Sequence, residues 1–360
     1  MKNQDKSKRK VRVGISIGDV NGIGLEVIIK TFSDTRILEE VTPIIYGSSK
    51  VMSYHRKALK ADHFNFMSIK DAAEAKSRKI NLVSCWEEDV KINLGERTNE
   101  GGVYALKSLE AATKDLASDK VDVLVTAPID KKAIQSKEFK FPGHTEYLAN
   151  MSGVDEALML MVTEGLRVGV VTGHIPITEV PKALTKESIL NKIKQLQACL
   201  QLDFGIRKPK IAVLGLNPHA GENGMLGEEE GSIITPAINA AKEDDILAFG
   251  PYPADGFFGS SNFKNFDAIL AMYHDQGLIP FKAMTFDRGV NYTAGLPIVR
   301  TSPDHGTAYE IAGKNQASES SFRQAVMLAK DVYLTRKTEK ELRSNPLKIT
   351  PPKVDRKEKK

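Results

Sequence analysis

The stretch that decides the fold lies at residues 268–275 and reads Ala268-Ile269-Leu270-Ala271-Met272-Tyr273-His274-Asp275. Two other apolar runs also end in a histidine-bearing turn, and they read Val168-Gly169-Val170-Val171-Thr172-Gly173-His174 and Ile211-Ala212-Val213-Leu214-Gly215-Leu216-Asn217-Pro218-His219. Short apolar runs bounded by Gly or Pro are typical of buried strands in a parallel sheet, and such sheets place ligands beyond the carboxyl ends of the strands. The sequence therefore predicts three imidazoles that meet at one edge of a sheet.

Strand and helix patterns alternate along the rest of the chain. The other candidate strands cover residues 11–17, 43–46, 80–83 and 121–126, and the clearest amphipathic helices cover 101–117, 186–202 and 319–334. Alternation of this kind predicts a doubly wound α/β sheet. We expect the last helix to pack back on the N-terminal half.

We divide the chain into two α/β/α domains with a cleft between them. The first covers residues 11–140 together with 305–336, and the second, residues 141–304, carries the metal and substrate loops. Residues 1–10 contain five Lys or Arg against one Asp, and residues 337–360 contain nine against four acidic residues. Since neither segment interleaves aromatics with its charges, we expect disordered basic tails and no nucleic-acid partner.

Composition favours a globular protein of the cytoplasm. Hydrophobic residues make up 41% of the 360 residues, which suffices for a packed interior. No apolar stretch approaches the roughly 20 residues of a membrane helix, and the N-terminus lacks the apolar segment of a signal peptide. Cys85 and Cys199 stand far apart in the sequence, which argues against a disulfide framework or a thiolate metal site.

The candidate metal ligands are His174, His219 and His274. Neutral imidazole suits zinc and related divalent ions, and a carboxylate or water can complete the shell. Their spacing matches no local metal motif, so the prediction depends on the fold. Asp275 and Asp255 are the carboxylates that could orient an imidazole or hold metal-bound water, although a plain turn before Gly256 explains Asp255 equally simply.

Cations and hydrogen-bond donors predict an anionic substrate. His144 and Thr145 stand at an expected helix start, where free N–H groups bind anions, although a plain N-cap is the alternative. Cationic and amide side chains crowd into the Gly- and Pro-rich loops that follow, at Lys282, Arg288, Asn291 and Arg300. Solvated surface charge is the alternative for this second group.

The glycine-rich stretch after the first expected strand reads Gly18-Asp19-Val20-Asn21-Gly22-Ile23-Gly24. Its glycine spacing differs from the GxGxxG of dinucleotide-binding folds, and it has no lysine of a P-loop. We therefore interpret it as a tight strand-to-helix turn that lines the cleft.

Six motifs together resemble the 4-hydroxythreonine-4-phosphate dehydrogenase family, which belongs to pyridoxal phosphate biosynthesis. They are PGHTEYLA (142–149), TGHIP (172–176), NPHAGE (217–222), PADGFF (253–258), YHDQGLIPFK (273–282) and GVNYTAGLPIVRTSPDHGTAYEIAGK (289–314). The resemblance implies an isocitrate- and isopropylmalate-dehydrogenase-like fold and a homodimer with a shared active site. It also implies NAD-dependent oxidation and decarboxylation of 4-phosphohydroxy-L-threonine to 3-amino-1-hydroxyacetone 1-phosphate and CO2.

Roles follow from the same resemblance. It implies that His174 and His219 of one subunit and His274 of the other bind one divalent ion, with zinc first and magnesium, manganese or cobalt as alternatives. The implied substrate contacts are His144, Thr145, Lys282, Asn291 and Arg300. The loop at 304–314 is similar to the adenosine-binding loop of the isocitrate and isopropylmalate dehydrogenases, which assigns NAD to His305, Gly306, Thr307 and Ala308.

The chemistry leaves several alternatives open. Lys282, Asp255 and Asp275 are the candidate catalytic residues, and the general base is His144, a metal hydroxide or Asp255. Gly173 and Gly256 stand where many family members are expected to have Thr. The rival functions are oxidation of another phosphorylated four-carbon acid such as erythronate 4-phosphate, a non-redox acyl transfer on a related fold, and a catalytically silent binding protein.

Overall fold

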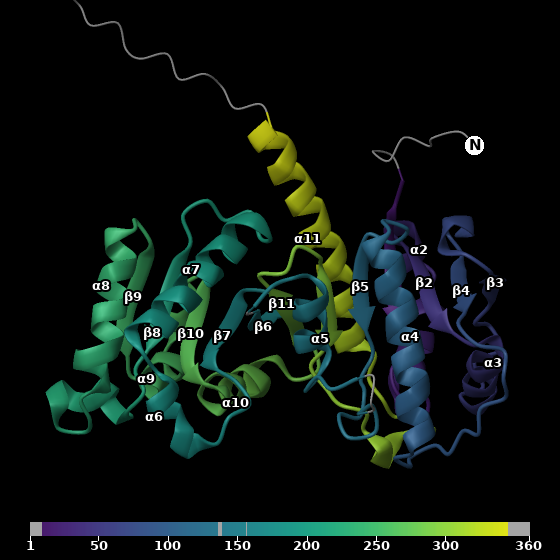
Figure 1. Ribbon diagram of the computed structural model, residues 1–360, viewed down its shortest axis with the longest axis horizontal. Coiled ribbons are helices and arrows are strands. Elements are labelled where there is room, and N and C mark those ends of the chain that lie inside the picture. Colours follow the sequence, from purple (N-terminus) through teal and green to yellow (C-terminus); the bar gives the residue numbers. More distant parts are fainter. Residues whose placement is uncertain (1–8, 136–138, 156, 345–360) are drawn as a thin grey trace, which may run out of the picture.

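The computed structural model describes residues 9–135, 139–155 and 157–344, and Figure 1 shows the chain from one side. In this part of the chain one sheet has the strand order β3-β4-β2-β1-β5-β12-β11-β6-β7-β10-β8-β9. The strands are β1 Val11–Ser16, β2 Val41–Gly47, β3 Phe66–Ile69, β4 Ile80–Ser84, β5 Val123–Thr126, β6 Leu158–Thr163, β7 Leu166–Thr172, β8 Lys210–Leu214, β9 Leu247–Tyr252, β10 Ala268–Tyr273, β11 Val290–Ala294 and β12 Arg300–Pro303. The α-helices are α1 Gly24–Ser33, α2 Ile37–Glu40, α3 Ser49–Ala58, α4 Asn99–Ala117, α5 His144–Met151, α6 Val180–Ala183, α7 Lys186–Leu202, α8 Thr235–Glu243, α9 Ala254–Gly259, α10 His274–Thr285 and α11 Ser320–Ser344.

The N-terminal half is a parallel sheet, β3-β4-β2-β1-β5, with helices on both faces. Alternate residues of each strand face opposite layers. Val13 and Ile15 of β1 lie in the hydrophobic cluster that includes α1 and α11, whereas Tyr46 of β2 and Leu124 of β5 lie in the cluster beneath α4. The predicted strands at 11–17, 43–46, 80–83 and 121–126 are confirmed.

The C-terminal half has the same layered form. Strands β7, β10, β8 and β9 are parallel to one another. Helices α7 and α8 cover one face, where Ile193 packs in the same large cluster as Val213 of β8. Helices α9 and α10 cover the other face, where Phe281 packs with Val168 of β7. The α/β prediction with layers on both faces is confirmed.

The centre of the sheet departs from the predicted parallel arrangement. Strand β6 is antiparallel to both β7 and β11, and β11 is antiparallel to β12. Glu164 and Gly165 form the two-residue link between β6 and β7, and Gly165 has φ 75°. A short link that ends in glycine favours a hairpin, since glycine adopts positive φ without steric cost. The parallel prediction is thus confirmed for β7 beside β10, but it does not extend to the antiparallel pairs that β6 and β11 make.

A narrow seam joins the two halves of the sheet. β12 pairs with β5 through Arg300 opposite Leu124 and Thr301 opposite Val125, and the Leu124 amide donates to the Val299 carbonyl at 3.0 Å. The sheet thus continues across the predicted domain boundary, and the division into two domains stays a prediction.

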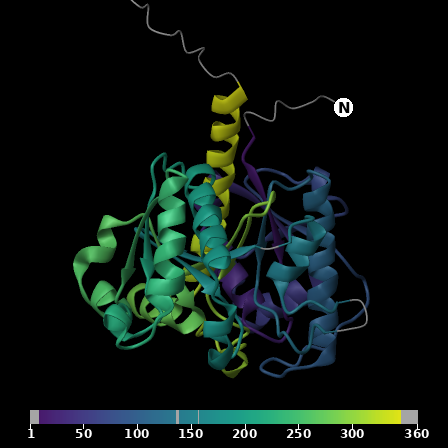
Figure 2. The same cartoon turned by 60° about the vertical axis from the view of Figure 1, so that its left-hand side comes forward.

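The chain ends differ from the predicted tails where they are described. Arg9 makes a bidentate ion pair with Asp122, with both N···O distances 2.7 Å, and Lys10 donates to the Leu38 carbonyl at 2.9 Å. Helix α11 packs on the N-terminal half as predicted. It continues to Ser344, so residues 337–344 are helical rather than disordered, and Figures 1 and 2 both show its last turns projecting beyond the sheet layers. Residues 1–8 and 345–360 of the predicted tails lie outside the described residues.

Membrane-spanning helices were not expected. Among the helices of the described ranges, none combines the length and the apolar composition that crossing a membrane requires.

Candidate active site

The three predicted metal ligands follow three neighbouring strands. The strand order β7-β10-β8 is parallel, so His174, His274 and His219 all come after the carboxyl ends of adjacent strands, as predicted. The rings of His174 and His274 have centroids 5.4 Å apart and line a cavity of about 220 Å³. Burial, with a smaller effect of the Lys131 cation, lowers the pKa of His174 below its ordinary value, which favours the neutral, ligating ring.

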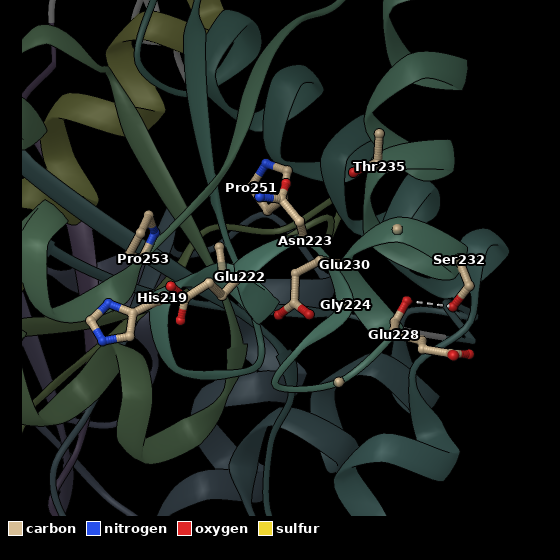
Figure 3. Close-up of a pocket in the computed structure, with 13 residues that line it drawn as sticks. His219, Glu222, Asn223, Gly224, Glu228, Glu230, Ser232, Thr235, Pro251 and Pro253 are labelled. Atoms are coloured by element: carbon tan, nitrogen blue, oxygen red, sulfur yellow. Dashed lines mark hydrogen bonds between the residues drawn. The ribbon is translucent and has the colours of Figure 1, made fainter.

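His219 lies apart from this pair in the single chain. It is exposed and lines a separate pocket of about 980 Å³, which Figure 3 shows with Glu230 in its middle and His219 at its edge. Within the described ranges, no three His, Cys, Asp or Glu side chains come together as a metal cluster. The sequence thus predicted the strand ends correctly, but the single chain brings together two of the three imidazoles.

The two predicted carboxylates lie differently. Asp275 Oδ1 is 2.7 Å from Nδ1 of His274, so that in the neutral ring Nδ1 donates and Nε2 keeps its lone pair for a ligand. Asp255 is exposed at the start of α9 and lines none of the cavities described here. A Cβ atom added at Gly173 or Gly256 would meet nothing within 4 Å, so packing does not demand glycine at either position.

The loop that carries His219 is a left-handed turn wrapped around one buried carboxylate. Residues 219–223 all have positive φ, between 42° and 76°, a conformation that costs free energy in residues other than glycine. Glu230 is buried, and its Oε1 accepts from the amides of Leu216 and Asn217 at 2.7 Å each. Its Oε2 accepts from Nδ2 of Asn217 at 3.0 Å. This carboxylate therefore fixes the start of the loop.

Replacing Glu230 with alanine is expected to lower the free energy of unfolding by about 2–4 kcal/mol, because the two half-buried amides of Leu216 and Asn217 lose their acceptor. Urea denaturation measures this change. The control is Glu228→Ala, whose side chain is exposed on the same loop and whose effect we expect to stay within about 0.5 kcal/mol. Equal effects of the two substitutions would contradict this role of the carboxylate.

Most of the predicted substrate residues gather in a third cavity, of about 200 Å³, which strands β5, β6, β11 and β12 line. Thr126 of β5, Met159 of β6, Asn291 of β11 and Ser302 of β12 form its floor, and His144 at the start of α5 closes one side. The predicted site residues that line it are His144, Thr145, His174, Asn291, Arg300, His305 and Gly306.

Arg300 is a buried cation with a side chain only 3% exposed. Its guanidinium donates to Thr126 Oγ1 at 2.7 and 3.1 Å and to Thr293 Oγ1 at 3.1 Å. No carboxylate within the described residues forms an ion pair with it. Burial lowers the pKa of Arg300 to about 10, which leaves it charged at neutral pH. The charge of Glu146 opposes this effect of burial only in part. Because a buried cation without an ion-paired carboxylate is costly, the cavity is suited to an anionic ligand.

His144 faces this cation and the cavity. Its Nδ1 lies 3.2 Å from Nη2 of Arg300, which can only donate, so Nδ1 accepts and Nε2 of the neutral ring carries the hydrogen. Burial, and then the charges of Arg300 and Lys131, hold the pKa of His144 well below its ordinary value. Nε2 is buried with no partner in the described part of the chain. His144 therefore presents an N–H donor to a ligand, and this geometry does not favour it as the general base.

Lys131 and Glu146 also line the cavity, and the sequence analysis missed both. Lys131 follows β5, whose carboxyl end could have marked it as a candidate. Glu146 lies inside the PGHTEYLA motif, where attention fell on the histidine and the threonine.

Lys282 was also predicted to contact the substrate, but it does not line this cavity in the single chain. Its Nζ donates to Oδ1 of Asp304 at 2.5 Å and to the Asp304 carbonyl at 3.0 Å. Burial raises the pKa of Asp304, and the Lys282 cation opposes that rise. Lys282 is thus linked to the cavity through Asp304, whose neighbour His305 lines it.

The loop predicted to bind NAD packs on the glycine-rich turn. The Ile23 amide donates to the Thr307 carbonyl at 3.0 Å, and the Tyr309 hydroxyl donates to Oδ2 of Asp19 at 2.7 Å. A Cβ atom at Gly22 would lie 2.8 Å from the Thr307 oxygen, so glycine is required for this approach. The turn therefore supports the loop at 304–314, and its place in the cleft between the two domains stays a prediction.

Known proteins resemble this chain over most of its length. Residues 39–329 match the sequence profile of the family described as "Pyridoxal phosphate biosynthetic protein PdxA". The 4-hydroxythreonine-4-phosphate dehydrogenase of Bacteroides thetaiotaomicron is 53% identical over 342 residues, which are 95% of this chain and 94% of that protein. The protein of the same name from Sulfurihydrogenibium is 42% identical over 319 residues, covering 89% of this chain and 97% of that protein. A crystal structure of 4-hydroxythreonine-4-phosphate dehydrogenase from Klebsiella pneumoniae has a TM-score of 0.77 at 33% identity and covers 91% of this chain and 99% of that one.

Proposed function

This chain belongs to the family of the pyridoxal phosphate biosynthetic protein PdxA, and from that premise we propose that it is a 4-hydroxythreonine-4-phosphate dehydrogenase. The proposed reaction oxidises the 3-hydroxyl of 4-phosphohydroxy-L-threonine and releases CO2 to give 3-amino-1-hydroxyacetone 1-phosphate. The dehydrogenase family implies NAD and a divalent metal ion in general terms.

The observation that carries the proposal is the buried Arg300 without a carboxylate partner. Lys131 adds a second positive charge to the same cavity, and the buried Nε2 of His144 adds an unused donor. Phosphate and carboxylate are the groups that arginine forks and such donors recognise. A substrate that carries both groups would supply the missing negative charge.

The donor set near the strand ends fits a divalent ion. His174 and His274 would hold it, with Asp275 orienting His274 and with His219 as the third ligand. Imidazole ligands favour zinc over magnesium, although manganese and cobalt remain compatible with the set. When bound, the ion would act as a Lewis acid toward the substrate oxygens.

The loop at 304–314 fits NAD at the edge of the substrate cavity. His305 and Gly306 line that cavity, and Nε2 of His305 is buried without a partner in the described residues. Thr307 and Ala308 continue the loop, and Ala308 has the left-handed conformation with φ 42°. When bound there, NAD would accept the hydride from the substrate carbon.

The residues of the chain then act mainly by positioning and charge. Arg300 and Lys131 bind the anionic groups, His144 and Thr145 donate hydrogen bonds, and the substrate is held in one orientation beside His305. Lys282 stabilises the negative charge that develops as CO2 leaves, or returns a proton to the carbon. Of the candidates for the general base, His144 is disfavoured because it presents an N–H donor to the ligand. A metal hydroxide and Asp255 stay open.

Formation of NADH in the presence of each purified phosphorylated acid tests the proposal. Turnover of 4-phosphohydroxy-L-threonine with release of CO2 supports it. Turnover of erythronate 4-phosphate alone would favour the related dehydrogenase, and acyl transfer or mere binding without NADH would favour the two remaining rivals. The relatives named above favour none of these alternatives.

Replacing Arg300 with glutamine is expected to raise KM by about 10- to 100-fold with a much smaller change in kcat, because an anchor contributes equally to ground and transition states. Steady-state kinetics at saturating NAD measures the split. Arg207→Gln serves as the control because that arginine is exposed and lines none of the cavities described here. A variant that keeps its fold and its KM would remove Arg300 from substrate binding.

Three further predictions accompany the proposal. We propose a homodimer in which each active site draws on both chains, and zinc as the resident ion. We also assign the reaction to the cytoplasm, as the composition suggested.

A further inference from the structure

Glu146 introduces a negative charge into a cavity that is otherwise built for anions. It lies in the first turn of α5, is half-buried, and lines the cavity with Arg300 and His144. Within the described residues it has no hydrogen-bond or ion-pair partner. Its charge acts on Arg300 and His174, but it forms an ion pair with neither. A carboxylate in this position repels phosphate and carboxylate groups and therefore favours a ligand that also offers a positive group.

Glu146 and Lys131 flank one point of the cavity without pairing. Oε2 of Glu146 and Cε of Lys131 lie 3.4 and 3.8 Å from the position that a Cβ atom would take on Gly143. No ion pair joins the two side chains in the described part of the chain. A carboxylate and an ammonium held side by side in this way complement a zwitterion, in which an ammonium and a carboxylate stand on the same carbon.

We infer that Glu146 binds the α-ammonium group of the substrate and makes the enzyme select an amino acid over its hydroxy-acid analogue. The inference rests on the proposed function and deepens it, because 4-phosphohydroxy-L-threonine and erythronate 4-phosphate differ at this carbon by an ammonium or a hydroxyl. Arg300 and Lys131 cannot distinguish the two acids, since both carry the same anionic groups. Glu146 can, because a carboxylate gains a charge-assisted hydrogen bond from an ammonium alone.

The test compares kinetics of the wild-type chain and Glu146→Gln on both acids. We expect kcat/KM for 4-phosphohydroxy-L-threonine to fall about 10- to 100-fold, which is the size of a charge-assisted hydrogen bond, mainly through KM. For erythronate 4-phosphate, we expect kcat/KM to stay the same or rise. Lys131→Met is expected to weaken both acids by similar factors, because its charge meets groups that the two share.

The matched control is Glu187→Gln. Glu187 also lies in the first turn of a helix, α7, but is exposed and lines none of the cavities described here, so it reproduces any effect of removing a helix-start charge. Melting temperatures and binding of inorganic phosphate are compared for all variants. In Glu146→Gln the melting temperature should be unchanged, and phosphate binding should stay the same or tighten, if the residue recognises the ammonium.

Three results would overturn the inference. Equal losses on the two acids in Glu146→Gln would show a structural role, and unchanged kinetics on the amino acid would show no role. In both cases the proposed function stands, since the wild-type chain turns over its substrate. A wild-type chain that is inactive on both acids would overturn the proposed function itself, and the inference with it.

Discussion

Lys282→Met is expected to lower kcat by about 10²- to 10⁴-fold while KM changes far less, because a group that stabilises developing charge or transfers a proton acts on the transition state. The structure links this lysine to the reacting region through Asp304, which it contacts at 2.5 Å and which precedes His305 of the cavity wall. Steady-state kinetics with the proposed substrate provides the measurement.

Two controls separate chemistry from structure in this experiment. Lys242→Met removes an exposed lysine at the end of α8 and should leave kcat unchanged. Asp304→Asn keeps Lys282 but removes the anionic partner of this lysine. The melting temperature of this variant reports how far the Lys282–Asp304 pair stabilises the loop at 304–314. An unchanged kcat in Lys282→Met would exclude the lysine from the chemical step.

Single alanine substitutions at His174, His219 and His274 are each expected to abolish turnover, and mixing the inactive chains should reveal how a dimer shares them. If His174 and His219 serve one site with His274 of the other subunit, mixing His174→Ala with His274→Ala chains restores one intact site per mixed dimer. Random exchange at equal ratio then gives about a quarter of wild-type activity.

Mixing His174→Ala with His219→Ala chains distinguishes the remaining arrangements of the three ligands. In the single chain His174 lies beside His274 and not beside His219. If that pair serves one ion and His219 comes from the other subunit, the His174/His274 mixture stays inactive and the His174/His219 mixture recovers. If all three ligands come from one chain, no mixture recovers. Native mass spectrometry confirms exchange, and elemental analysis of the active enzyme must find a divalent metal.

Local patterns predicted most of the layers of this fold. The apolar runs at 168–172, 211–214 and 268–273 are strands because nothing polar interrupts them, and the helix at 186–202 matches the observed bounds of α7. The antiparallel centre was missed for two reasons. Strands β11 and β12 are short and carry polar residues such as Asn291 and Arg300, and the Glu164–Gly165 link was too short to stand out from the runs on either side.

Residue types in the sequence indicated which side chains line the cavities, but not which side chains contact one another. Histidines at strand ends and cations in loops pointed to residues that the structure brings to the cavities beside the strand ends. That Lys282 meets Asp304, that Glu230 holds the His219 loop, and that Lys131 and Glu146 share a cavity depends on contacts between segments far apart in sequence. No periodicity within one segment encodes such contacts, so a single sequence does not reveal them.

The seam between β5 and β12 places Arg300, the residue that we propose to bind the anion, where the two halves of the sheet meet. Arg300 is itself the residue that pairs with Leu124 where the two halves of the sheet join. A rotation of one half of the sheet against the other would bend the backbone beside this guanidinium, and we therefore expect a ligand bound to Arg300 to oppose such a rotation. We expect a bound phosphorylated acid to slow hydrogen exchange at the Leu124 amide more than at amides of the outer strands, because a ligand on Arg300 would hold the two sides of the seam together.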